Sequence, residues 1–438
     1  MSTQAAAVDA RPVAPPERRP ALAGAWVVSG SMLASGLLIY LFHVLAARVL
    51  GGAAYGQIAV LWAAMFVVVI VVFRPLEQTT ARGLADRRAR GEETRTVLRT
   101  VVLLGGAALL VVGAVFLLGW GFIGDRLFAG DGTMTAMLLV GIAAYGVAYV
   151  SRGVVTGERW FGGYGLGLLA DAVSRLAIAA PLVFVASKNV AAAAVAVAGL
   201  VGALVPLWVG RRRLGSVAAA GTGSHFRIGS ALAFAGPASV IAAADQLLVN
   251  GSPLLVVADA GAEASAVAGV VFAATMLVRV PVYVFQGVAA SILPNLTHLQ
   301  VVGDARRFRR AAIQTAGFLA AAGVVIVGFA AVAGPESMRL VYGDDFAAGR
   351  TELVLLGAGV AFYLAATTFS QALLALDRGR SAAFGWGSSA VVFIGLYLVL
   401  PGEPLMRISL AFACATAADL ALLSAALLGR RPGRQAST

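Results

Sequence analysis

Five charged residues interrupt long apolar stretches of the sequence, close to the midpoints of four of them. They are Asp171 and Arg175 in one stretch, Asp245 in a second, Arg279 in a third and Asp419 in a fourth. A charge at the centre of a bilayer costs about 2.5–3.5 kcal/mol on insertion, so such residues are expected to face a partner or a wet cavity. Transporters place their cargo and coupling-ion sites at this depth.

Asp171 and Arg175 are four positions apart and therefore share one face of a helix. Two interpretations stay open for them: a self-neutralising ion pair inside the bundle, or a site where arginine meets an anionic group of the cargo. A desolvated acid can also titrate, which makes Asp245, Asp171 and Asp419 candidate coupling acids for a proton or sodium gradient. No other cofactor and no metal site is expected.

Polar side chains form two stripes beside these charges. Arg279, Tyr283 and Gln286 share a helix face, and Gln246 and Asn250 form a shorter stripe. The stripes either line a cleft, where they hydrogen-bond sugar hydroxyls while arginine meets phosphate, or join neighbouring helices. The candidate cleft residues are Arg279, Arg175, Tyr283, Gln286, Gln246 and Asn250. His43 is expected at the outer membrane interface.

The elements that position these residues are membrane spans. The chain is 60% hydrophobic and 12% charged, whereas soluble domains are about 45–50% apolar and about 25% charged. A span needs about 20 apolar residues. Twelve such stretches occur, near 24–47, 56–73, 98–120, 134–155, 164–186, 190–210, 228–257, 266–294, 311–334, 352–376, 382–400 and 407–428.

The basic residues indicate the orientation of the spans. Clusters at 87–90, 211–213, 306–310 and 430–431 fall on one side of the membrane in a twelve-span arrangement. Because basic loops stay in the cytoplasm, both termini are expected there, in a multi-pass protein of the bacterial cytoplasmic membrane. The net charge of +12 then reflects topology, and no nucleic-acid partner is expected.

A nearly repeated phrase divides the chain into halves. "RLFAGD" begins at Arg126 and "RLVYGD" at Arg339, 213 residues apart, after the third and the ninth span. A chain that crosses the membrane six times ends on the side where it began. The two halves therefore start on the same side and are expected to be parallel repeats. The fold class is therefore an all-α polytopic membrane protein with about twelve transmembrane helices, in two parallel-repeat six-helix bundles around a central cleft.

The expected domains follow from this repeat. They are a disordered cytoplasmic tail over 1–21, an N-terminal bundle over 22–213, a cytoplasmic connector over 214–227, a C-terminal bundle over 228–430 and a cytoplasmic tail over 431–438. The Pro-rich, polar composition of the first segment is typical of disorder.

Three stretches resemble polysaccharide transporters of the multidrug/oligosaccharidyl-lipid/polysaccharide flippase superfamily. "ARVLGGAAYG" (47–56) is similar to a signature near the start of that family, "FRPLEQTTARGLADRRARG" (73–91) to its first cytoplasmic loop, and "LVRVPVYVFQGVAASILPNL" (277–296) to its eighth span. The resemblance implies a flippase that carries a lipid-linked pyrophosphate oligosaccharide from the inner to the outer leaflet. It also implies glycosyltransferases and a polymerase as partners in surface polysaccharide assembly, besides membrane lipids.

Other functions fit the sequence less well. A phosphate-binding loop needs Gly-Lys-Ser/Thr, but the only lysine, Lys188, follows Ser187. An enzyme needs acids or bases displayed on a sizeable extramembrane surface, and no long loop provides one. The nearer alternative is a multidrug or metabolite exporter of the same superfamily.

Overall fold

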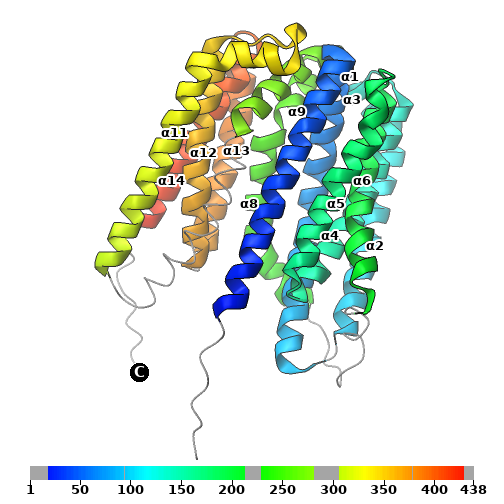
Figure 1. Cartoon of the computed structure of the whole chain (residues 1–438), viewed down its shortest axis with the longest axis vertical. Coiled ribbons are helices and arrows are strands. Elements are labelled where there is room, and N and C mark those ends of the chain that lie inside the picture. The colour runs from blue at the N-terminus through cyan, green and yellow to red at the C-terminus, as the bar shows by residue number, and fades with distance from the viewer. Residues whose placement is uncertain (1–17, 93, 213–227, 281–304, 377, 429–438) are drawn as a thin grey trace, which may run out of the picture.

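Long α-helices that run side by side form the protein (Figure 1). The computed structural model describes residues 18–92, 94–212, 228–280, 305–376 and 378–428. Within these residues, ten helices are long and apolar enough to cross a membrane, and a bent pair makes up to eleven. The chain is therefore a multi-pass membrane protein. Tyr283 and Gln286 lie outside the described residues, as do the predicted connector and most of both predicted tails.

The helices of the first half are α1 (Arg18–Arg90), α2 (Arg95–Leu118), α3 (Trp120–Phe128), α4 (Gly132–Gly157), α5 (Phe161–Ala179), the 3-10 turn η1 (Ala180–Val183) and α6 (Lys188–Val209). Those of the second half are α8 (Ile228–Asn250), α9 (Ser252–Ala260), η3 (Ala262–Ala264), a helix over 265–280, α11 (Ala305–Tyr342), η4 (Asp344–Phe346), α12 (Arg350–Ala375), α13 (Gly379–Val399) and α14 (Pro404–Leu428).

The helix α1 contains the first two predicted spans. They are separated at Gly51, whose φ of 71° lies in the left-handed region that glycine adopts readily. The second arm then continues through Pro75 to Arg90. The prediction of a loop after Phe73 is wrong for this stretch, because one proline removes a single helical hydrogen bond without stopping a helix that its neighbours hold.

Both copies of the repeated phrase end a helix. In the first copy, α3 stops at Phe128, and Asp131 then caps α4 by accepting hydrogen bonds from the backbone N–H of Thr133 at 2.9 Å and of Met134 at 3.1 Å. In the second copy, α11 stops at Tyr342 and Gly343 follows with a φ of 102°. The two turns lead into α4 and α12, the corresponding fourth spans of the two halves.

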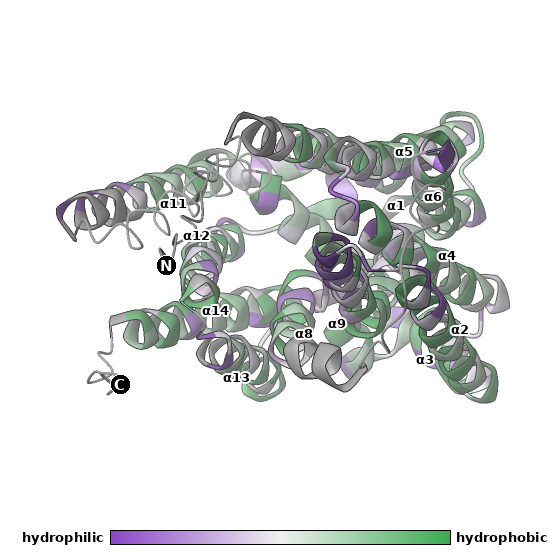
Figure 2. Cartoon of the chain, turned by 90° about the horizontal axis from the view of Figure 1, so that it is seen from below, coloured by the Kyte–Doolittle hydropathy of each residue, from purple (hydrophilic) through white to green (hydrophobic). Residues whose placement is uncertain are grey.

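The halves lie next to each other. Helices α2 to α6 lie on one side and α11 to α14 on the other, with α1 and α8 between them (Figures 1 and 2). Hydrophobic colour covers most of the helix surfaces in Figure 2, as expected for helices in lipid. This arrangement confirms the predicted two-bundle fold class.

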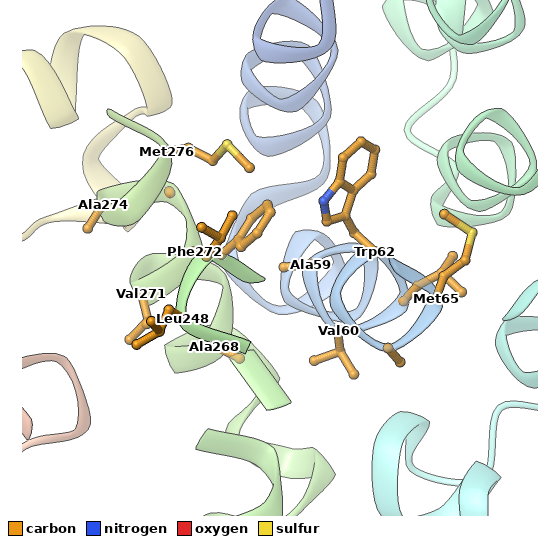
Figure 3. Close-up of a cluster of buried hydrophobic side chains, with 14 of the residues drawn as sticks. Ala59, Val60, Trp62, Met65, Leu248, Ala268, Val271, Phe272, Ala274 and Met276 are labelled. Carbon is orange, nitrogen blue, oxygen red and sulfur yellow. The ribbon is translucent and has the colours of Figure 1, made fainter. Parts of the chain in front are cut away.

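An apolar seam joins the halves near the middle of the molecule. Phe272 of the 265–280 helix points toward Ala59 and Trp62 of α1 (Figure 3). Phe272 and Ala59 are fully buried and Trp62 is nearly so. The seam therefore excludes water where these two helices meet.

Candidate functional site

The first half holds a buried polar cluster around Asp171 of α5. Arg175 donates to its Oδ1 from 2.7 Å, and the hydroxyl of Tyr145 donates to the same oxygen from 2.9 Å. Arg175 also donates to the Tyr145 hydroxyl, and its guanidinium carbon lies 4.9 Å from the centre of the Trp62 ring. Because Arg175 is fully buried, its contacts are internal to the bundle in this conformation.

A second arginine completes this cluster. Arg152 of α4 places Nη2 at 3.4 Å from the other carboxylate oxygen of Asp171, and its guanidinium lies over the ring of Tyr149. The Asp171 carboxylate thus has two cationic neighbours and one hydroxyl donor. The cluster carries more positive than negative charge, and Arg152 is its partly exposed member.

The second half holds a related arrangement around Asp245 of α8. The hydroxyl of Tyr363, on α12, donates to Asp245 at 2.6 Å, and the amide of Gln246 donates to it at 3.2 Å. Gln246 in turn accepts a hydrogen bond from Asn250 at 2.7 Å. Gln246 and Asn250 are buried, so the shorter predicted stripe is a chain of hydrogen bonds along α8.

Arg279 and Asp419 flank this arrangement. Arg279 donates to the backbone carbonyl of Val249 at 2.6 Å, which ties its helix to α8. Asp419 is buried, lies within electrostatic range of Asp245, and has one oxygen without a hydrogen-bond partner among the described residues. The structure thus brings Asp245, Asp419 and Arg279 together in one half, and Asp171 and Arg175 in the other.

Arg74 of α1 connects the two groups. It interacts electrostatically with Glu77 and Tyr149 in its own half and with Asp245 in the other half. Yet its side chain is exposed, and it makes no hydrogen bond or ion pair within the described residues. Arg74 therefore lies within electrostatic range of charged groups in both halves.

Sequence reasoning missed Arg74 and Glu77. Both follow the second apolar stretch and flank Pro75, a pattern that is typical of a loop. The signal that could have found them is their spacing of three residues on a continuing helix, which places them on one face. Glu77 lies within electrostatic range of Arg152, and Arg74 within that of Asp245. Arg279 acts on the same tyrosine, Tyr363, as Arg74 and Asp245 do.

The location of His43 differs from the prediction, which placed it at the outer membrane interface. It is fully buried among the rings of Phe42, Tyr55, Trp62 and Phe272. The aromatic residues come from both halves, and the seam between the halves covers the histidine. An isolated span could not have revealed this burial.

A separate cavity of about 710 Å³ lies between α11, α12 and α14. Its described lining is apolar apart from Ser424. It has none of the convergent polar groups that fix a ligand's orientation, so we place the candidate site at the charged residues around Arg74 and Asp245 instead.

The fold is that of transporters. The chain superimposes on an inward-facing multidrug resistance MATE family transporter of the MOP superfamily with a TM-score of 0.68 and 15% identity, covering 91% of this chain and 98% of the other. It superimposes on an outward-facing structure from that family with a TM-score of 0.62 and 13% identity, covering 92% and 95%. Solved transporters of this fold have twelve helices in two bundles.

A third solved structure is a MOP superfamily transporter from Pyrococcus furiosus, described as having a binding pocket of reverse polarity that suggests a different function. Its TM-score is 0.64 at 13% identity, covering 92% of this chain and 94% of the other. In sequence, the chain is 28% identical to the uncharacterized proteins Rv3630 and Rv1510 of Mycobacterium tuberculosis, over 408 and 403 residues. These alignments cover 89% and 90% of this chain and 90% and 89% of the relatives. No protein-family model matches the sequence.

Proposed function

We propose that this protein is an alternating-access exporter whose cargo is an amphipathic small molecule that binds between the two halves. The observation that carries the proposal is that Arg74 of one half lies within electrostatic range of Asp245 of the other half and makes no ion pair among the described residues. Rocking of one bundle against the other would expose these charges to each side of the membrane in turn.

The solved neighbours support a multidrug or metabolite exporter more directly than a flippase. Two of them are described as multidrug resistance transporters, and the charges near the junction of the halves are mixed in sign. Asp245 and Glu77 would meet a cationic group of the cargo, and Arg74 would meet an anionic one. Apolar helix faces around them would accommodate the rest of the molecule.

Flipping of a lipid-linked oligosaccharide is the second candidate. Arg74, Arg152 and Arg279 favour it, because arginine binds phosphate groups in a bidentate way. The resemblance of the Ala47–Gly56 stretch to polysaccharide transporters also supports it. For this cargo, we propose the bacterial cytoplasmic membrane as the location and glycosyltransferases as pathway partners.

The test uses a strain that lacks the protein, complemented with the wild type or with Asp245→Asn. Accumulation of cationic and anionic fluorescent dyes is measured in parallel with lipid-linked oligosaccharides in the inner leaflet. The exporter proposal predicts that a dye accumulates in the deletion strain and that only the wild type clears it. Accumulation of the glycan alone selects the second candidate, and no change in either contradicts both.

Coupling to an ion gradient is a separate part of the proposal. We propose that Asp171, Asp245 and Asp419 are the residues at which protons or sodium ions exchange. Collapsing the proton gradient and the sodium gradient separately in vesicles identifies the ion, and transport that survives both treatments contradicts ion coupling.

A further inference from the structure

The stretch from Ala47 to Gly56 includes the break in α1, at the end of the molecule drawn uppermost in Figure 1. We call this end the Gly51 end. We propose that this stretch and the turn from Leu340 to Phe346 form a gate that closes the cleft at the Gly51 end, with Arg48 as its latch. The inference rests on the proposed transport function. It assigns a role to the Ala47–Gly56 stretch, which contributes no residue to the candidate site.

Arg48 joins the two halves directly. Its Nε donates to the backbone carbonyl of Val341 at 2.8 Å, and its Nη2 donates to that of Leu340. Both carbonyls belong to the last turn of α11, where carbonyl groups lack partners within the helix. The guanidinium also sits at the negative end of the helix dipole. An arginine of one half therefore completes the end of a helix in the other.

Glycines let the backbones touch beside this latch. Gly52 and Gly56 lie against the start of the 265–280 helix, and a methyl group added to Gly56 would overlap the carbonyl of Ser265. A methyl group on Gly269 would lie 2.8 Å from the carbonyl oxygen of Gly52. Such contacts between small residues let helices pack tightly in membranes. They require that no larger side chain stands between the two backbones.

Aromatic rings seal the same contact. The ring centre of Tyr55 lies 5.5 Å from that of Phe346, and that of Tyr40 lies 6.3 Å from that of Tyr342. Both pairs join the first half to the second in edge-to-face geometry, and Tyr55, Phe346 and Tyr342 are buried. These buried rings thus hold the two halves in contact at the Gly51 end.

The geometry favours a contact that opens and closes. Arg74 lies on the second arm of α1, 23 residues after Gly51, and a helix rise of about 1.5 Å per residue puts it about 35 Å from that residue. The side chain of Arg74 is exposed, whereas Tyr55, Tyr342 and Phe346 at the Gly51 end are buried. Cargo can leave at the Gly51 end only if the gate separates. Its latch is solvent-exposed and non-covalent, as such separation requires.

A disulfide across the gate tests the inference. An ideal Cβ at Gly52 would lie 3.8 Å from the Cβ of Ala266, within the range of about 3.5–4.5 Å found in disulfides. The double variant Gly52→Cys/Ala266→Cys is made with Cys414→Ala, which removes the exposed natural thiol. We expect oxidation to link the cysteines and to reduce transport to background, and reduction to restore it. Failure to link, or full transport by linked protein, overturns the gate. Each single-cysteine variant serves as a control.

A second measurement needs no cargo. Spin labels at Ala53→Cys and Ala347→Cys, both exposed positions in different halves, report the separation of the Gly51 end in vesicles. Arg48→Ala should raise the ratio of long to short distances about threefold, because a charge at a helix end contributes a fraction of a kcal/mol to about 1 kcal/mol. Arg339→Ala is the matched control, since its exposed side chain makes no hydrogen bond or ion pair among the described residues.

The two measurements separate the gate from the transport proposal. An unchanged distance distribution in Arg48→Ala overturns the latch even if transport continues. If the distances respond as expected but no dye or glycan moves in any assay, the gate stands and the proposed function fails.

Discussion

Tyr145 and Tyr363 occupy corresponding positions in the two halves, and each donates its hydroxyl to a carboxylate on another helix. Tyr145 bonds to Asp171 at 2.9 Å and Tyr363 bonds to Asp245 at 2.6 Å. The tyrosines lie on α4 and α12, the helices that follow the two copies of the repeated phrase. The partners differ, since Asp171 is on the fifth span and Asp245 on the seventh. The two halves thus have the hydroxyl donor at the same position, whereas the carboxylate that accepts from it lies on a different span in each half.

Removal of either hydroxyl should destabilise the protein. We expect Tyr145→Phe and Tyr363→Phe each to lower the free energy of unfolding by about 1–3 kcal/mol, because each leaves a desolvated carboxylate with one donor fewer. Thermal unfolding in detergent measures the loss. Tyr164→Phe is the control, since the Tyr164 hydroxyl makes no hydrogen bond among the described residues, and its melting temperature should stay unchanged. Equal stability of all three variants contradicts this role.

Arg175 should contribute mainly to stability. We expect Arg175→Ala to lower the free energy of unfolding by about 3–5 kcal/mol, since it breaks the buried ion pair and leaves Asp171 with only Tyr145 and the more distant Arg152. The double variant Asp171→Asn/Arg175→Met should recover much of that loss, because it removes both charges. The comparison uses unfolding in detergent. A single variant as stable as the wild type, but inactive in transport, would instead place Arg175 in the cargo site.

Arg74 should act on transport without affecting folding. We expect Arg74→Gln to reduce the transport rate about tenfold or more, since a lost charge-assisted contact is worth about 1.5–3 kcal/mol, while the melting temperature changes little. Arg90→Gln, on the same helix, removes only the exposed pair with Asp86 and should leave transport intact. Equal transport by the two variants contradicts the cleft assignment.

Asp131 should make stability depend on pH. Burial raises its pKa, but Lys188 and the backbone N–H groups of Met134 and Thr133 lower it more, so the pKa of Asp131 lies below its usual value. The ionised Asp131 therefore stabilises the folded protein at pH values above its pKa in the unfolded chain, which is about 3.9. This stabilisation is lost as the pH falls through the lower pKa that Asp131 has in the folded protein.

The variant Asp131→Asn isolates this effect, because asparagine also caps helices but cannot pair with Lys188, which lies 2.6 Å away. At neutral pH, we expect the variant to be less stable than the wild type by about 0.5–1 kcal/mol. The difference in melting temperature should shrink as the pH falls below about 4. A difference that is independent of pH contradicts the charge interaction.

The sequence was sufficient to predict the spans and the two-half arrangement, because apolar length and the repeated phrase are local features. It also predicts a common depth for charges such as Asp171 and Asp245, which stays a prediction. It could not decide whether Arg175 faces the cleft or an internal partner, since that depends on Tyr145 and Trp62 from other helices.

Arg74 and His43 show that the local sequence does not determine the environment of a side chain. Arg74 resembles a loop residue because Pro75 follows it, yet the helix continues and brings Arg74 within electrostatic range of Asp245 in the other half. His43 resembled an interfacial residue because of its position in one span, yet the other half buries it. In both cases, contacts between distant segments determine the environment.

The most direct test of alternating access is to measure the separation of the halves at both ends of the molecule. One spin-label pair, Ala53→Cys and Ala347→Cys, reports the Gly51 end. A second pair, Phe161→Cys and Arg380→Cys, is exposed at the start of α5 and α13 and reports the opposite end. In lipid vesicles, we predict two populations in which a longer distance at one end accompanies a shorter distance at the other, with a transported dye or an ion gradient changing their ratio. A single fixed distance at both ends under every condition would contradict the account.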